Sequence, residues 1–231
     1  MKLYIANKNY SSWSLRPWVL MRMLEIDFEE VLVPFQGGGP QAAFLAFSPS
    51  GKVPCLVDGK LTVWDSLAIA ETLAERYPEV WPERYTARTW ARSASAEMHS
   101  GFATIRNVCG MSCGQRVELV DPPAALAKEW ARVDALWCEG LAQFRGPFLA
   151  GTRFTAVDAF YAPVAFRAQT YSPSLSEEAQ AYVERLLALA PMQAWYADAL
   201  AEPWRDEDHE AEVRAAGRVT ADLRAPVSAG E

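Results

Sequence analysis

The chain has 231 residues and a mass of 25.6 kDa, the size of one large domain or two small ones. Its 51% hydrophobic and 22% charged residues are typical of a folded protein and exclude a disordered chain, a collagen-like repeat and a coiled-coil rod. The net charge of −7 argues against a groove for nucleic-acid phosphates. Neither a run of roughly 18 apolar residues nor a signal-peptide pattern is present, so we expect a cytoplasmic protein.

Residues 1–80 alternate between strand-like and helix-like patterns. Val19, Met23 and Ile26 are spaced to form one face of a helix. Asp58-Gly59 between two β-type runs is a strong signal for a β-hairpin. The predicted elements are a strand at 2–6, a helix at 14–25, a strand at 28–33, a Gly/Pro loop at 37–40, strands at 54–57 and 61–64, and a helix from 65 to about 76. The order is therefore βαβ, a long connection, and ββα.

Helical patterns replace the strand signals from about residue 86 onward. They predict helices at 86–108, 123–144, 155–169, 176–189 and 192–200. Thr155 and Asp158 have the S/T-x-x-D spacing of a capping box, which we interpret as a folding element. After Trp204 the composition turns polar and charged, and we expect that segment to be ordered only in part. The predicted division is a domain at 1–80, an all-helical domain at 84–210 and a polar tail at 211–231.

The four cysteines show no pattern of a metal site. Cys109 and Cys113 are four positions apart, but no second cysteine pair completes a zinc site, and the only histidines are His99 and His209. In a reducing cytoplasm we expect free thiols, several of them buried. We therefore predict no metal cofactor.

Three motifs in the first domain carry a resemblance to a known family. The first loop reads Tyr-Ser-Ser-Trp-Ser-Leu-Arg over residues 10–16, a Gly-Lys-Val-Pro turn stands at 51–54, and Asp65-Ser66 begins a helix. Together they resemble the cytosolic glutathione S-transferases of the serine type, and the first loop is most similar to the zeta class, which includes the maleylacetoacetate isomerases. The resemblance covers essentially the whole chain. It implies a thioredoxin-like glutathione-binding domain followed by an all-α domain.

The resemblance also implies how glutathione is held. Val53-Pro54 would be a cis peptide bond, with Val53 pairing its main chain to the cysteinyl part of glutathione; a trans proline at a strand edge is the alternative. Ser66 would hold the γ-glutamyl carboxylate, with Asp65 on the amine, at a helix start whose free N–H groups suit an anion. A helix cap alone is the simpler interpretation of that pair. Lys52 would reach the glycyl carboxylate or remain a solvated lysine.

Activation of the glutathione thiol falls to the first loop. A thiol with a pKa of about 8.5 is only slightly ionised at neutral pH, and a hydroxyl donor or a helix N-terminus stabilises its thiolate. Ser11, Ser12 and Ser14 all stand at the start of the first helix, so spacing alone does not separate a catalytic serine from a helix cap. The zeta-like pattern assigns the catalytic role to Ser11, assisted by Ser12. Tyr10 and Tyr4 are alternative hydroxyl donors.

The second-substrate pocket is predicted in the helical domain. Its candidate residues are Trp13, His99, Arg106 and Met111, with Cys109 and Cys113 as further apolar lining. Trp13 replaces a cysteine often found two positions after the family's catalytic serine, which argues against disulfide chemistry. His99-Ser100 stands where zeta-type isomerases have a His-Pro sequence, so His99 is either a site residue or a structural histidine.

By resemblance, the leading function is transfer of glutathione, the co-substrate, to a small electrophile by a homodimer. One alternative is glutathione-dependent cis–trans isomerisation of a maleyl-type diacid. That reaction needs cationic side chains for two carboxylates, and Arg16, Arg106 and Arg116 are the candidates, although the sequence shows no basic cluster. The other alternative is a glutathione-binding module without turnover. We expect neither a nucleic acid nor a membrane as partner.

Overall fold

The N-terminal domain contains a four-stranded mixed sheet with helices on both faces. The computed structural model describes residues 1–35 and 42–226, so the predicted Gly/Pro loop at 37–40 lies outside the described residues. The elements are β1 (Lys2–Ile5), α1 (Ser12–Met23), β2 (Glu29–Leu32), α2 (Ala42–Leu45), β3 (Cys55–Asp58), β4 (Leu61–Trp64) and α3 (Ser66–Ala74). Every predicted strand and helix of this domain is present, with boundaries shifted by at most two residues, while the short α2 was not predicted.

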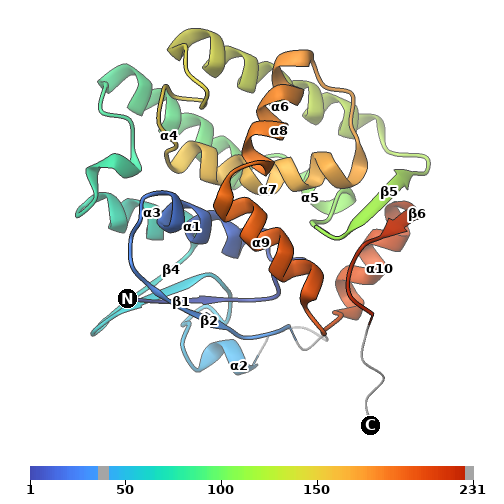
Figure 1. The fold of residues 1–231 in the computed structure, drawn as a ribbon, viewed down its shortest axis with the longest axis horizontal. Coiled ribbons are helices and arrows are strands. Elements are labelled where there is room, and N and C mark those ends of the chain that lie inside the picture. The colour runs from blue at the N-terminus through green and yellow to red at the C-terminus, as the bar shows by residue number, and fades with distance from the viewer. Residues whose placement is uncertain (36–41, 227–231) are drawn as a thin grey trace.

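Strand pairing follows the order β2-β1-β3-β4. The β1–β2 pair is parallel, as the intervening helix α1 requires, and the β1–β3 and β3–β4 pairs are antiparallel. Asp58 pairs with Leu61 across the β3–β4 hairpin, where Gly59 has a φ of +61° that glycine adopts without a steric penalty. Helices α1 and α3 lie between this sheet and the helical domain, and α2 lies on the other side of the sheet (Figure 1). This arrangement confirms the predicted thioredoxin-like βαβ-ββα order.

The second domain is built around one buried helix. Its elements are the 3₁₀ turn η1 (Pro78–Val80), α4 (Tyr85–Ser100), α5 (Ala103–Val108), β5 (Gln115–Leu119), α6 (Ala124–Phe144), α7 (Ala156–Tyr171), α8 (Glu177–Leu187), α9 (Ala190–Ala201), α10 (Glu207–Ala216) and β6 (Gly217–Asp222). Helix α7 is buried along nearly its whole length and packs against α1, α4 and α8 (Figure 1). The contact between α1 and α7 therefore joins the two domains at the helix that carries the candidate serines.

The predicted capping box is present at the start of α7. Thr155 N–H donates to the Asp158 carboxylate over 3.0 Å. The same carboxylate accepts hydrogen bonds from Leu149 N–H and from the Tyr182 hydroxyl. Although these donors favour the charged form, complete burial raises the pKa of Asp158 to about 6. The box is a folding element, as expected.

One predicted helix is two helices in the structure. The pattern at 86–108 divides into α4 and α5 at Gly101 and Phe102, where Phe102 is in the left-handed region with a φ of +54°. At the start of α5 the N–H groups of Thr104 and Ile105 have no partner within their own helix. They donate to the Glu129 carboxylate of α6 over 3.1 and 2.8 Å. The prediction failed because this cap comes from another helix and not from a neighbouring residue.

The second domain is also not entirely helical, and the predicted polar tail folds. Strands β5 and β6 form an antiparallel pair with a register shift at Arg116 and Val117. Helix α10 packs beside them at one edge of the molecule (Figure 1). The polar composition of 211–226 was misleading because β6 alternates half-buried and exposed residues and gains its hydrogen bonds from a strand far away in the sequence.

Candidate functional site

A cavity of about 790 Å³ lies between the two domains. Its walls come from the start of α1, the turn before β3, the α5 end, α7 and the start of α10. The predicted site residues that line it are Ser11, Ser12, Trp13, Lys52, Val53, Arg106 and Met111. The remaining predicted site residues, which are not in this lining, are Ser14, Pro54, Asp65, Ser66 and His99. Folding thus brings the first loop, the Gly-Lys-Val-Pro turn and the predicted second-substrate residues to one opening.

The three candidate serines occupy different places. Ser11 is the N-cap residue of α1, but its side chain makes no capping hydrogen bond. Its hydroxyl instead donates to Ser14 Oγ over 2.7 Å, and Ser14 Oγ also accepts from Ala6 N–H over 3.3 Å. Ser14 is fully buried behind Ser11 and away from the cavity, so it supports Ser11 and does not face a ligand in the cavity.

Ser12 is paired with an arginine that the sequence analysis did not single out. Arg167 of α7 is 4% exposed, lines the cavity and donates from Nη2 to Ser12 Oγ over 3.3 Å. Its Nε donates to the Cys109 carbonyl over 2.8 Å. Burial lowers the pKa of Arg167 to about 10, and the guanidinium still carries its charge at neutral pH. No sequence signal marks Arg167 as a site residue. An arginine on a mostly apolar helix stands out only when the structure shows that the helix is buried at the centre of its domain and borders the cavity.

The cavity wall is more basic than expected. Arg106, Arg167 and Lys52 line it together, and the Arg16 guanidinium stacks on the inner wall residue Trp13 at 4.1 Å. Burial, followed by repulsion from the other two arginines, lowers the pKa of Arg16 to about 9. Arg16 and Arg106 were candidates from the sequence, but their positions along the chain show no basic cluster. Folding creates one from four separate segments.

Three other residues that the sequence suggested for the second-substrate pocket lie outside the cavity lining. Arg116 belongs to β5 and donates to the main-chain carbonyls of Cys113 and Gln115 and to the Tyr196 hydroxyl, so it is not part of the basic cluster. The thiols of Cys109 and Cys113 are completely buried and do not line the cavity, and burial raises the pKa of both. Met111 is the one residue of that loop that lines the cavity as expected.

The Val53-Pro54 peptide bond is cis, as the resemblance implied. Val53 lines the cavity beside Lys52, and Pro54 is buried at the start of β3. The turn therefore lines the same opening as Ser11.

The Asp65-Ser66 pair caps α3 beyond the edge of that lining. The Asp65 carboxylate accepts from the N–H groups of Leu67 and Ala68, so the capping interpretation of this residue is correct. Buried Ser66 lies beside Arg16, with Nη1 and Oγ at 3.5 Å. Arg16 also has a buried Nε without a partner within the described residues, which leaves a donor available at this end of the site.

His99 lies at this end too, and not in the predicted second-substrate pocket. Its Nε2 is 3.5 Å from Asp65 Oδ2, and its ring meets Trp13 edge-on at 5.3 Å. Burial lowers the pKa of His99, although Asp65 opposes the change. A second histidine, His209, lines the cavity instead.

The tyrosines considered as hydroxyl donors are both engaged otherwise. Tyr4 stacks on Phe47 at 4.2 Å outside the cavity. The Tyr10 ring lines the cavity, but its hydroxyl donates to Glu210 over 2.5 Å and accepts from Arg224 over 3.0 Å. Burial is the main cause that raises the pKa of Tyr10. Neither hydroxyl is placed to serve a ligand as well as Ser11 is.

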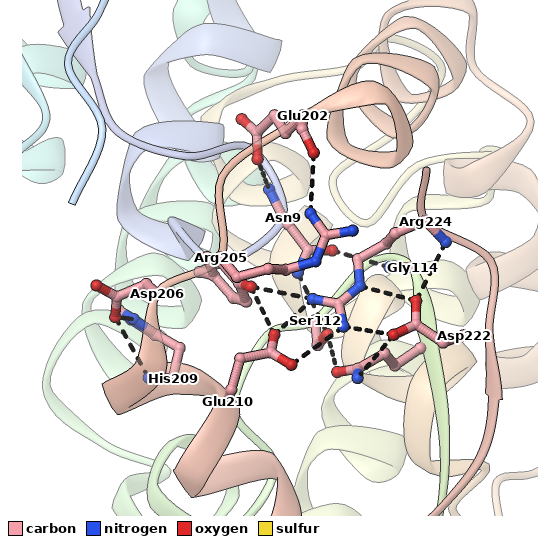
Figure 2. Close-up of polar contacts among 12 residues, drawn as sticks. Asn9, Ser112, Gly114, Glu202, Arg205, Asp206, His209, Glu210, Asp222 and Arg224 are labelled. Atoms are coloured by element: carbon pink, nitrogen blue, oxygen red, sulfur yellow. Dashed lines mark hydrogen bonds and ion pairs between the residues drawn. The ribbon is translucent and has the colours of Figure 1, made fainter. Parts of the chain in front are cut away.

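A polar network joins the first loop to the C-terminal segment (Figure 2). Asn9 donates from its main chain to Glu202, and its side-chain oxygen accepts from Gly114 N–H. Arg224 binds both Glu210 and Asp222. The network thus anchors the segment that follows α9, whose residues Asp206, Asp208, His209 and Glu212 line the cavity.

The described residues contain neither a helix that could span a membrane nor a cluster of potential metal ligands. Within residues 1–35 and 42–226, no helix is both long and apolar enough to cross a bilayer. In the same ranges, no three His, Cys, Asp or Glu side chains gather where they could hold a metal ion.

Comparison with protein families identifies this architecture. Residues 10–76 match the model of the glutathione S-transferase N-terminal domain, and residues 90–207 match that of its C-terminal domain. The chain belongs to the glutathione S-transferase family. This membership confirms the resemblance stated for the sequence, and with it the prediction of a glutathione S-transferase-like enzyme.

Curated glutathione S-transferases and isomerases are similar to the chain. "Glutathione S-transferase 1" of Dianthus caryophyllus is 27% identical over 71% of this chain and 75% of its own length. A "Probable maleylacetoacetate isomerase" of Vibrio cholerae serotype O1 is 28% identical over 76% and 86%, respectively. The chain spans about half the length of another relative, "Glutathione S-transferase DHAR2" of Arabidopsis thaliana, which is 36% identical over 52% of this chain.

Among solved structures, a glutathione transferase homologue from Burkholderia, crystallised with bound glutathione, is similar in fold. It has a TM-score of 0.65 and 21% identity, and the match covers 86% of this chain and 97% of that one.

Proposed function

We propose that this glutathione S-transferase binds glutathione in the cavity between its domains, holds the thiol as a thiolate and adds it to a small electrophile. The observation that carries the proposal is the position of Ser11. Its hydroxyl makes no cap for its own helix, and Ser11 lies at the N-terminal end of α1 and lines the cavity together with Val53. Glutathione bound along that turn would bring its sulfur to this hydroxyl.

Ser11 and Ser14 together form a pair that can serve a thiolate. Hydroxyl hydrogens rotate to suit their partners, so Ser14 can donate to Ser11 while Ser11 donates to sulfur. Hydrogen bonds linked in this way strengthen one another in a low-dielectric site. The Arg167 guanidinium, which donates to the Ser12 hydroxyl, adds positive potential nearby. Both effects favour the charged form of the thiol.

The two carboxylates of glutathione have cationic partners at opposite ends. Lys52 lines the cavity and is the partner we assign to the glycyl carboxylate. Ser66 at the start of α3, with Arg16 beside it, is the partner we assign to the γ-glutamyl carboxylate. Asp65 and His99, which lie together at that end, are assigned to the amine.

This function is tested by measuring the thiolate absorbance of bound glutathione as a function of pH, in wild type and in Ser11→Ala. Loss of one hydrogen bond to a charged group costs roughly 1.5–3 kcal/mol. The pKa of the bound thiol should therefore rise by about 1–2 units. Turnover near neutral pH should fall about tenfold or more, while glutathione affinity changes little.

Ser12→Ala and Ser14→Ala are the matched variants. Because Ser14 acts through Ser11, its loss should raise the thiol pKa less than loss of Ser11 does. A raised pKa only in Ser12→Ala would transfer the role to Ser12. Wild-type protein that fails to bind immobilised glutathione would contradict the function altogether. Binding without turnover of any electrophile would favour the non-catalytic glutathione-binding module.

A second candidate function is glutathione-dependent isomerisation of a maleyl-type diacid. The observation that favours it is the presence of both Arg106 and Arg167 in the cavity wall, since two guanidinium groups suit two carboxylates. We expect Arg106→Met to raise KM for a maleyl-type diacid at least about tenfold, with little effect on an uncharged electrophile. Equal changes for both substrates would remove the support for the isomerase.

A further inference from the structure

His209 and Asp206, at the start of α10, form a hydrogen-bonded pair in the cavity wall that no sequence motif indicated. His209 Nδ1 lies 2.5 Å from Asp206 Oδ2, and the Asp206 side chain is only 4% exposed (Figure 2). Asp206 is also the N-cap of α10, because it accepts from His209 N–H over 3.3 Å. Two separate contacts therefore fix this carboxylate against the imidazole.

The geometry determines which ring nitrogen faces a ligand. A carboxylate accepts hydrogen bonds, so Nδ1 carries the hydrogen and Nε2 is the acceptor of the neutral ring. The His209 side chain is 30% exposed and lines the cavity, and no described residue forms a hydrogen bond with Nε2. The pair has the arrangement of an oriented base: one nitrogen is held by a carboxylate and the other is open to the cavity.

Aromatic rings hold the imidazole near the place assigned to the glutathione sulfur. The His209 ring stacks on Tyr10 at 5.0 Å and lies against Phe35 at 4.9 Å. Tyr10 directly precedes Ser11, and its own hydroxyl is held by Glu210 and Arg224. Ser11 and His209 therefore line the same cavity, with the Tyr10 ring packed against the imidazole.

Resting on the proposed function, we propose that His209 is the proton carrier when glutathione adds to an α,β-unsaturated carbonyl compound. Nε2 accepts the proton of the glutathione S–H group and becomes an imidazolium that Asp206 stabilises. The thiolate forms a carbon–sulfur bond at the β carbon of an α,β-unsaturated carbonyl compound, and the alkene π pair moves to the α carbon. Nε2–H then returns the proton to that carbon. Atoms and charge balance without any further reactant.

The other groups that face the cavity are poorly suited to this step. They are Lys52, Arg106 and Arg167, Asp208 and Glu212, and the Tyr10 ring. The cations serve as anion partners, and the Tyr10 hydroxyl is occupied by Glu210 and Arg224. Histidine is the side chain that both takes up and releases a proton near neutral pH.

The test compares two electrophiles in wild type and His209→Asn. The asparagine amide can still donate to Asp206 from the position of Nδ1 but has no group at Nε2. Addition of glutathione to an α,β-unsaturated ketone should fall about 100-fold, the range of general acid–base catalysis. Substitution on a chlorodinitrobenzene should be nearly unchanged: a thiol that Ser11 stabilises as the thiolate can lose its proton to water without His209, and chloride leaves with its electron pair, so no proton has to be returned to carbon. Glu207→Gln, an exposed change in the same turn of α10, is the control.

Imidazole rescue makes the test independent of folding. In His209→Ala, added imidazole should restore addition to the ketone and leave the substitution unaffected. Equal losses for both electrophiles, no loss for either, or no rescue would overturn the role of His209. Calorimetry separates this result from failure of the proposed function: wild-type protein that does not bind glutathione overturns both, whereas intact binding with equal losses overturns the role of His209 alone.

Discussion

Glu202, at the end of α9, is a buried carboxyl group that supports the candidate site from behind. It accepts from the N–H groups of Lys8 and Asn9, over 2.5 and 3.2 Å, in the loop that leads to Ser11 (Figure 2). Burial raises its pKa to about 7, even though both N–H donors and Lys8 favour the charged form. The folded protein therefore holds a proton on Glu202 at pH values where the unfolded chain has lost it.

This proton predicts a pH dependence of stability. Because the pKa is higher in the folded state, folding takes up a proton between about pH 4.5 and pH 7. The contribution of Glu202 to the free energy of unfolding should be full below pH 4.5 and decline as the pH rises through about 7. Chemical denaturation of wild type and Glu202→Gln across this range measures it, since other titrating groups cancel in the difference. A constant difference between the two proteins would contradict the prediction.

At the scale of elements, Arg224 is a buried side chain that links α10 and β6 to the first loop. Its side chain is 3% exposed and binds Glu210 of α10, Asp222 of β6 and the Tyr10 hydroxyl. Hydrogen bonds to these anions raise its pKa above the ordinary arginine value, although burial opposes this. One guanidinium thus connects the first loop, the last helix and the last strand.

We expect Arg224→Met to destabilise the protein strongly. Removing one partner from a buried ion pair leaves an uncompensated charge and costs about 3–5 kcal/mol. Tyr10→Phe is the matched change, because it deletes one hydroxyl from the same network and should cost only about 1 kcal/mol. Urea unfolding gives both values. A smaller cost for Arg224→Met than for Tyr10→Phe would show that the network does not hold these elements.

At the scale of the whole molecule, the expected homodimer needs an exposed apolar surface. The edge strand β4 and helix α3 offer one, where Trp64, 46% exposed, lies beside Leu67 and Ala68. An exposed tryptophan side chain on an edge strand is typical of a surface that contacts another chain. This surface supports the dimer that the resemblance implies.

Sedimentation equilibrium at micromolar concentration should show a dimer for the wild type. Trp64→Glu should shift the equilibrium to the monomer, because it places a charge in the contact. Leu223→Glu changes a residue of similar exposure at the C-terminal end and should leave the dimer intact. A monomeric wild type, or equal effects of both changes, would contradict the prediction.

Local patterns were sufficient for the first domain and for the motifs of the site. The Asp58-Gly59 hairpin, the helix start at Asp65 and the capping box at Thr155 depend on residues within a few positions of one another. The pairing of β5 with β6 was missed, because Gln115 and Asp222 are 107 positions apart and neither strand is stable alone. The division of the predicted helix at Phe102 was missed because its cap, Glu129, comes from α6.

The sequence by itself determined the family, the order of elements in the first domain and the candidates Ser11, Val53 and Lys52, because these depend on short motifs. Only the tertiary structure separated Ser14 from the other serines, moved His99 to the Asp65 end and brought Arg167 and His209 into the cavity. The physical reason is that charge and hydrogen bonding act over a few ångströms of space, whatever the distance along the chain. A residue's neighbours in the cavity come from helices that the sequence places far apart.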